Sequence, residues 1–163
     1  MVAQSCLWTI KYLLIKMRNI KLIFLIISFL IITNFAKANL NISLQKYLDD
    51  KNLEESSSQI YFLKRCSAIY AYASGVVLKS DAISSKNFIE ISNNLLFKSV
   101  ELMVIEENKK LEEAQKEAEI NRKQLFNNYI ADGKKNWEKN KSHFKGSYIS
   151  EDMAICSKLT EEE

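Results

Sequence analysis

Hydrophobic residues recur at intervals of three and four along two consecutive stretches in the middle of the chain. Such spacing places them on one face of a helix. In residues 58–78 the apolar positions are Ile60, Leu63, Cys66, Ile69, Tyr70, Ala73, Val76 and Val77. In residues 85–105 they are Phe88, Ile91, Leu95, Leu102 and Ile105, widened by Leu96 and Met103. We predict two amphipathic helices that pair as an antiparallel hairpin and supply the core.

Helix and turn signals flank this hairpin. Ser56, Ser57 and Ser58 are good N-cap residues for its first helix. The polar segment 80–85, SDAISS, predicts the turn between the two helices. Residues 41–52 have a rough helical spacing of apolar positions and predict a short, peripheral helix.

Residues 106–123 change character and carry few apolar side chains among many charges. Glu106 precedes Lys110 by four positions, and Glu112 precedes Lys116 in the same way, which stabilises a helix. We predict a charged, mostly solvated arm that extends the second helix of the hairpin. A coiled-coil dimer is the weaker interpretation, because the seven-residue spacing of Leu111 and Ala118 does not persist.

Apolar residues return after the arm and then reach a helix stop signal. Leu125, Phe126, Tyr129 and Ile130 continue the helix, and Asp132-Gly133 offers glycine for a left-handed C-cap. Ser150, followed by two acids, predicts the N-terminus of a last helix with Met153, Cys156 and Leu159 on one side.

These segments, with no proline and only three glycines in the chain, predict an all-α fold. We expect residues 39–163 to form one domain, either an antiparallel helical hairpin or a small three- to four-helix domain. One of its helices would be long and partly solvated, and one disulfide would hold the domain together.

The N-terminal region has the pattern of a secretion signal. Lys21 precedes an uninterrupted apolar run over residues 22–32, and Ala36 and Ala38 form a small-x-small cleavage site. We predict that residues 1–38 are a signal peptide cleaved after Ala38, with Met17 as an alternative start of translation. The alternative is an uncleaved inner-membrane anchor over residues 22–36, but the apolar run is shorter than the roughly 20 residues that a spanning helix needs. If the signal is cleaved, we expect the protein to contact the membrane only transiently, during export.

Charge follows this division of the chain. Of the 23 Lys and Arg residues, five precede Asn39, and no acid does. The remainder has 18 bases and 20 acids, a formal charge of −2. A near-neutral domain lacks the basic field that nucleic acid binding requires, so we expect no nucleic acid partner.

The predicted mature chain keeps two cysteines, Cys66 and Cys156. In an oxidising compartment such a pair favours a disulfide over two free thiols. This bond would tie the C-terminal helix back to the hairpin in a periplasmic or secreted protein.

Few residue patterns suggest catalysis. His143 is the only histidine, no G-x-S-x-G elbow is present, and the serines cluster at caps and turns. Adjacent acids such as Glu151-Asp152 lie in hydrophilic sequence, and Lys64-Arg65 is interpreted as a solvated pair. We therefore expect no enzyme activity, no metal and no cofactor.

A non-catalytic accessory module that binds another envelope protein is the leading functional prediction, as a monomer or weak homodimer. Its surface would be the charged arm around Leu111 or the aromatic face of residues 58–78 that carries Tyr70 and Tyr72. The alternative is a small-molecule pocket between helices near these two tyrosines. A basic strip with Trp137 and Phe144 is a further candidate surface for anionic lipid or an acidic partner. Its lysines are Lys134, Lys135, Lys139, Lys141 and Lys145.

The segments 64–68 (KRCSA) and 152–156 (DMAIC), together with the signal pattern, resemble those of small exported helical proteins of unknown function. The resemblance covers two short patches. It implies a link between the two cysteines and a periplasmic address, and it transfers no catalytic residue.

Overall fold

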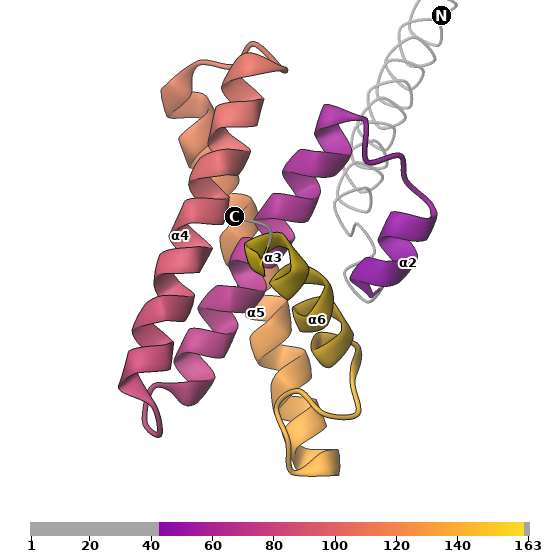
Figure 1. Cartoon of the computed structure of the whole chain (residues 1–163), viewed down its shortest axis with the longest axis vertical. Helices are drawn as coiled ribbons and strands as arrows, with labels where there is room; N and C mark the ends of the chain where they lie inside the picture. The colour runs from indigo at the N-terminus through magenta and orange to yellow at the C-terminus, as the bar shows by residue number, and fades with distance from the viewer. Residues whose placement is uncertain (1–42, 162–163) are drawn as a thin grey trace, which may run out of the picture. The chain divides into compact units, whose positions relative to one another are not determined.

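The computed structural model describes residues 43–161, and in this range it is all-helical, as predicted. Two long helices form an antiparallel hairpin, a third long helix packs on both, and two shorter helices lie at one side (Figure 1). The helices are α2 (Leu44–Asp49), α3 (Ser56–Val77), α4 (Ala82–Ile105), α5 (Leu111–Asn140) and α6 (Tyr148–Glu161).

The expected signal segment, with Ala36 and Ala38, lies outside the described residues. Within residues 43–161, no helix combines the length and the apolar character that crossing a membrane requires. The prediction of a short helix near residues 41–52 is confirmed by α2.

The α3–α4 hairpin is held along its interface by small buried serines as well as by aliphatic residues. Ser67 Oγ donates to Ser92 O, and Ser92 Oγ donates to Ser67 O, both at 2.7 Å. Seven residues further along α3, Ser74 Oγ donates to Ser85 O at 2.8 Å. A step of seven residues forward in α3 therefore matches seven backward in α4, the register of an antiparallel pair. These serines are exceptions to the expected clustering at caps and turns, because their hydroxyls are buried and hydrogen-bonded within the hairpin.

The prediction that residues 106–123 extend the second helix of the hairpin is wrong. Helix α4 ends at Ile105, and α5 begins at Leu111 after a turn in which Asn108 has a φ of 54°. The segment is mostly exposed, as predicted, but Ala114 and Ala118 are buried against Met103. The small alanine side chains let α5 approach α4 closely just after the turn, where charge pairs alone gave no reason for a break.

The helix stop predicted at Asp132-Gly133 is also wrong. Helix α5 continues to Asn140 and ends at Lys141, which adopts the left-handed conformation with a φ of 54°. Gly133 is buried, and a Cβ placed there would lie 1.7 Å from the Tyr72 hydroxyl. The glycine is therefore required for the close approach of α3 to α5, because any larger residue collides with the tyrosine.

Gly133→Ala should destabilise the fold by about 1–3 kcal/mol, because the added methyl overpacks the contact with Tyr72. Gly75→Ala is the matched control, since Gly75 is exposed in α3 with nothing within 4 Å of an added Cβ. That substitution should stabilise the protein by about 0.5–1 kcal/mol through helix propensity. Urea denaturation of both variants measures the difference, and equal effects of the two substitutions would contradict the packing proposed here.

Candidate functional site

The predicted disulfide joins α3 to α6. Cys66 and Cys156 are bonded, with 5.4 Å between their Cα atoms and 90 residues between them in sequence, and both are fully buried. A cross-link that closes so long a loop restricts the unfolded chain and stabilises the fold by roughly 4–5 kcal/mol in the loop-entropy model. It secures the C-terminal helix to the hairpin.

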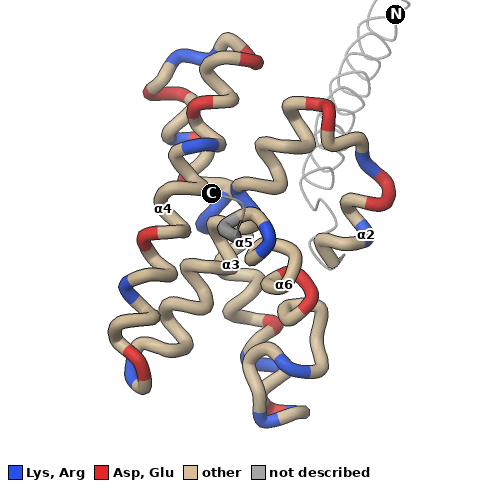
Figure 2. The backbone as a smooth tube through the Cα atoms, in the orientation of Figure 1, with Lys and Arg blue, Asp and Glu red and all other residues tan. Residues whose placement is uncertain are grey.

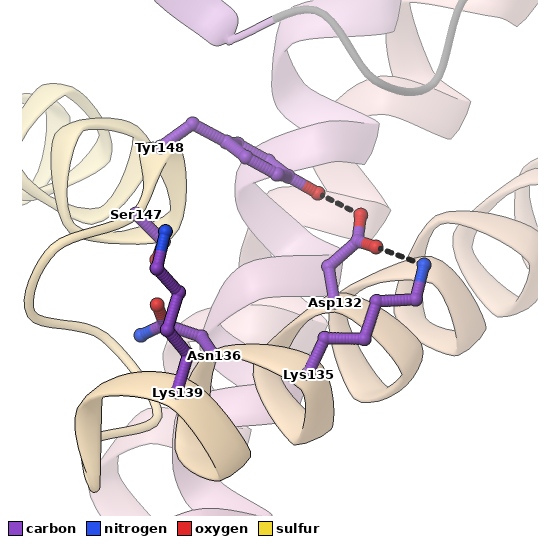
Figure 3. Close-up of a pocket in the computed structure, with 6 residues that line it drawn as sticks. All are labelled: Asp132, Lys135, Asn136, Lys139, Ser147 and Tyr148. Carbon is purple, nitrogen blue, oxygen red and sulfur yellow. Dashed lines mark hydrogen bonds and ion pairs between the residues drawn. The ribbon is translucent and has the colours of Figure 1, made fainter.

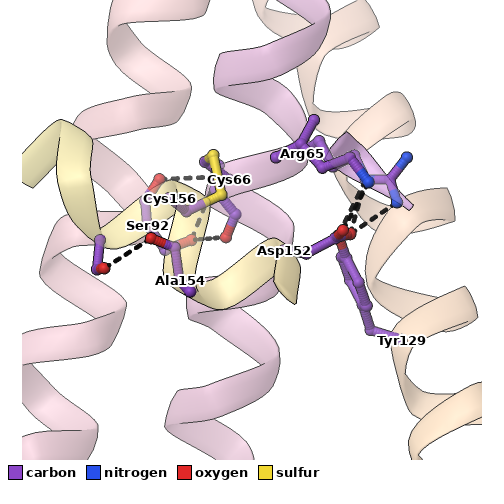
Figure 4. Close-up of a disulfide and its surroundings, with 10 residues drawn as sticks. Arg65, Cys66, Ser92, Tyr129, Asp152, Ala154 and Cys156 are labelled. Atoms are coloured by element: carbon purple, nitrogen blue, oxygen red, sulfur yellow. Dashed lines mark hydrogen bonds and ion pairs between the residues drawn. A yellow bond between two sulfur atoms is a disulfide. The ribbon is translucent and has the colours of Figure 1, made fainter. Parts of the chain in front are cut away.

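The carboxylate of Asp152 lies one helical turn before Cys156 and is the centre of a buried polar network (Figure 4). Arg65, next to Cys66, donates to Asp152 Oδ2 from Nη2 at 2.6 Å and from Nε at 3.0 Å. The Tyr129 hydroxyl donates to the same oxygen at 2.7 Å, and the Leu44 backbone N–H donates to Oδ1 at 2.6 Å. One carboxylate thus connects α2, α3, α5 and α6, and we call these four residues the Asp152 network.

Two sequence interpretations fail at this network. Lys64-Arg65 is not a solvated pair, because Arg65 is only 2% exposed, and Asp152 is completely buried rather than in hydrophilic surroundings. Local composition could not show this, since the partners are 87 residues apart. The available signal was that Arg65 adjoins one cysteine of the disulfide and Asp152 precedes the other by one turn, which places them side by side once the disulfide is assumed.

Electrostatics favour the charged state of Arg65 and the neutral state of Tyr129. Burial opposes the charge on Arg65, but the attraction of the facing Tyr129 and Asp152 outweighs it, and the pKa of the guanidinium is raised. Burial, and the neighbouring Asp152 carboxylate, raise the pKa of Tyr129 well above its usual value. Paired and hydrogen-bonded charges are tolerated in an interior. Because the carboxylate has no exposed surface, it cannot contact a substrate, and we assign the network a structural role.

A second charged cluster holds the α4–α5 turn against α3. Lys109 Nζ lies 2.6 Å from Glu117 and 2.9 Å from Glu107, and Lys64 Nζ lies 3.8 Å from Glu117. The hydrogen bond from Lys109 lowers the pKa of Glu117, while burial lowers the pKa of Lys64. These contacts fix the turn that separates α4 from α5.

The four residues that the sequence marked as an interaction surface do not come together. Tyr70 and Tyr72 are core residues: Tyr70 packs on Phe88, with ring centroids 5.8 Å apart, and burial raises the pKa of Tyr72 to about 12. Leu111 and Trp137 are exposed, but they lie near opposite ends of α5. With 26 residues between them, their backbones are separated by about 39 Å of helix. Tyr70 and Tyr72 are therefore not available for binding a partner.

An open groove runs between α4 and α5, and sequence reasoning did not identify it. Two clefts of about 320 and 440 Å³ share Asn93, Glu119 and Arg122 and form its length. Arg122 Nη1 donates to Asn93 Oδ1 at 3.0 Å and bridges the two walls at the middle. The apolar lining comes from Ala71, Ile89, Leu96, Phe97, Val100 and Phe126.

The groove follows from the way α4 and α5 diverge. Close to their connecting turn the two helices pack through Val100, Ala114 and Ala118. Further from the turn they separate, with α3 between them (Figure 1), and Ala71 of α3 lines the cleft there. On both walls the lining extends over twelve residues, from Ile89 to Val100 and from Gln115 to Phe126, and the eleven helical steps between them cover about 16 Å.

A second hollow, of about 310 Å³, lies at the far end of α5 (Figure 3). Asp132 in it accepts from the Tyr148 hydroxyl at 2.8 Å and pairs with Lys135 Nζ at 3.2 Å. Lys139 extends toward Ser147 at the opposite wall (Figure 3). The hollow is shallow, its lining residues all carry polar groups, and its acid is already paired.

His143, expected at the surface, is half-buried at this same end. Its Nδ1 is hydrogen-bonded to the Tyr72 hydroxyl at 3.0 Å, and its ring stacks on Trp137 with centroids 4.9 Å apart. In the part of the chain that the structure describes, no group of three or more histidine, cysteine or acidic residues could hold a metal ion. Histidine here orients the tryptophan.

Comparison of this chain with protein-family models, with curated proteins and with solved structures found no match. Two surface regions of the described residues remain as candidates for function, the α4–α5 groove and the far end of α5 around Trp137.

Asp152→Ala should destabilise the protein by about 3–5 kcal/mol, because it leaves the buried Arg65 charge without its partner. Glu151→Ala, at the adjacent exposed position, should change stability by less than about 0.5 kcal/mol. The pair Arg65→Met and Asp152→Leu combined should recover most of the loss, because it removes both charges together. Denaturation of the oxidised proteins tests this series; a double variant as unstable as Asp152→Ala would contradict the ion-pair explanation.

Proposed function

We propose that this protein is an extracytoplasmic, non-catalytic module that binds an amphipathic helix of an envelope protein in the α4–α5 groove. The observation that carries the proposal is an open groove between α4 and α5 whose lining combines exposed apolar side chains with polar and charged ones. Grooves of this kind recognise helices through side chains spaced three and four residues apart.

Exposure of apolar residues along the groove supports this proposal. Phe97 is 66% exposed and Ile89 is 40% exposed, and both line the groove on the same side of α4. Clustered exposed apolar residues bordered by polar ones mark sites of protein contact. Covering them with a partner would remove from water the apolar surface that the fold leaves open.

The dimensions and charges of the groove define the partner. A length of about 16 Å fits three turns of helix, which offer three to four apolar side chains on one face. Arg122 meets only the neutral amide of Asn93 across the groove, and Lys123 lines the same stretch. Glu119 lines the groove as well and offsets one of these two positive charges, and a carboxylate near the middle of the partner helix would complement the other.

An address outside the cytoplasm is supported by the Cys66–Cys156 disulfide, because such bonds persist in oxidising compartments. The sequence alternative of a small-molecule site at Tyr70 and Tyr72 gains no support, since both side chains pack against other aromatic rings. Of the two surfaces that the sequence suggested for partner binding, we retain only part of the charged arm over residues 106–123. That part is the face of α5 that lines the groove.

Photo-crosslinking in intact cells tests the groove directly. A photoreactive phenylalanine analogue at position 97 should give a discrete adduct with one envelope protein, linked within an amphipathic helical segment. The same analogue at position 83 is the matched control, because Ile83 is 78% exposed on α4 but does not line the groove. Adducts should be absent there.

A second arm of the experiment uses the analogue at position 89 together with Phe97→Glu. Burying a carboxylate in the apolar groove should reduce the adduct at position 89 at least about tenfold, which corresponds to roughly 1.4 kcal/mol. Identical adducts from positions 97 and 83, or an adduct at 89 that Phe97→Glu leaves unchanged, would refute the groove as the binding site.

A further inference from the structure

The far end of α5 and the loop that follows it form a basic platform, which we define as residues 134–145. It contains five lysines and a single acid, Glu138. All five lysines are exposed: Lys134, Lys135, Lys139, Lys141 and Lys145. Figure 2 shows these bases gathered at the end of the molecule away from the α4–α5 turn. The positive charge is local, because the predicted mature chain as a whole has more acids than bases.

Hydrogen bonds hold the loop of this platform against the helix. The buried side chain of Asn136 donates from Nδ2 to Ser142 O at 2.7 Å and to Lys145 O at 3.1 Å. Asn140 Nδ2 in turn donates to Asn136 Oδ1 at 2.6 Å, and Ser142 Oγ accepts from the Lys145 N–H at 2.9 Å. The loop lysines are therefore fixed near those of the helix before any partner binds, which lowers the entropic cost of binding.

Trp137 gives the platform an apolar contact point. Its ring is 47% exposed although it stacks on His143, which is itself hydrogen-bonded to Tyr72 of α3. A lysine in the last turn of α5 can be explained by helix stability alone, because a cation there complements the helix dipole. Helix stability does not explain an exposed tryptophan that stacks on a histidine fixed by its own hydrogen bond to Tyr72.

We infer that this platform binds the surface of an anionic lipid bilayer, with Trp137 at the level of the headgroups and the lysines against lipid phosphates. Tryptophan prefers this interfacial depth, and clustered lysines are attracted to anionic headgroups. All five bases are lysine, a flexible point charge, whereas recognition of a defined carboxylate on a protein favours the planar fork of arginine. This distinction favours a bilayer over an acidic protein.

The acids close to the platform do not cancel its field. Asp132 is paired with Lys135 and accepts from Tyr148, so its charge is already offset. Glu138 is exposed and lies four positions after Lys134, where the two charges compensate on the helix surface. Lys139, Lys141 and Lys145 remain as excess positive charge beside Trp137.

Vesicle binding tests the inference. The protein is expressed from its full sequence and used as the cell processes it. Vesicles of phosphatidylcholine alone are compared with vesicles that also contain phosphatidylglycerol. Lys139→Gln combined with Lys145→Gln should reduce partitioning onto the anionic vesicles roughly 25-fold at low salt, about fivefold for each lysine. Lys110→Gln combined with Lys116→Gln is the matched control, because it removes the same charge at exposed positions near the other end of α5.

Fluorescence of Trp137 supplies an independent readout. The chain has two tryptophans, so Trp8→Phe leaves Trp137 as the sole emitter in any form of the protein. Its emission should shift to the blue with phosphatidylglycerol vesicles and return as salt screens the lysines. Equal binding to both vesicle types, equal losses in the two double variants, or an emission that does not change on binding would each overturn the inference. Binding through any uncharged segment affects all variants alike and cannot imitate the expected difference.

Discussion

A single buried carboxylate determines how the helices of this domain are held together. Asp152 accepts hydrogen bonds from Arg65, Tyr129 and Leu44, and so links α6 to three other helices at one point. The interior makes these bonds strong, and it makes the loss of any partner costly. Because Asp152 and Cys156 are one turn apart, the ion pair and the disulfide constrain the same face of α6, and each positions the partners of the other.

The two candidate surfaces depend on this arrangement. The disulfide and the Asp152 network attach α6 and α2 at one side of α3, whereas α4 covers another side, so α5 packs on α3 in the space that remains. Its approach is close at Gly133 beside Tyr72 and close at Ala118 beside Met103. Between these contacts α4 and α5 diverge and leave the groove. Beyond Gly133 the same helix continues to carry the basic platform. Partner binding and lipid contact would therefore use separate parts of α5.

Local sequence information predicted the elements whose formation is local. The spacing of residues such as Ile60, Ile69 and Leu95 depends only on which face of a helix is buried, and it identified α3, α4 and their pairing. The break before Leu111 and the continuation through Gly133 were missed, because both follow from tertiary contacts. Charge pairs in residues 106–123 favour helix, but the ion pairs of Lys109 and the packing of Ala114 favour a turn. Similarly, a glycine that resembles a helix stop is retained inside a helix because Tyr72 leaves no room for a side chain.

The candidate sites were less accessible to sequence reasoning than the fold. The cysteine pairing followed from the presence of two cysteines in a chain predicted to reach an oxidising compartment. The groove, in contrast, depends on how α4 and α5 diverge, and the sequence of either helix alone does not show this. Arg65 and Asp152 were assigned to the surface because charged residues are rarely buried unless paired, and the pairing became visible only in three dimensions. Trp137 was identified as exposed beside lysines, yet its support by His143 depends on a loop folding back onto α5.

Residue-resolved hydrogen exchange in Asp152→Asn, with the disulfide kept oxidised, tests the central role of this carboxylate most directly. We predict that the Leu44 amide and the amides of α2 and early α6 lose protection, because the hydrogen bond that anchors them to Asp152 is weakened. Amides along the serine-lined α3–α4 interface should keep theirs. Unchanged protection at Leu44 and in α6, or a uniform loss throughout the domain, would contradict the view that Asp152 holds these helices in place.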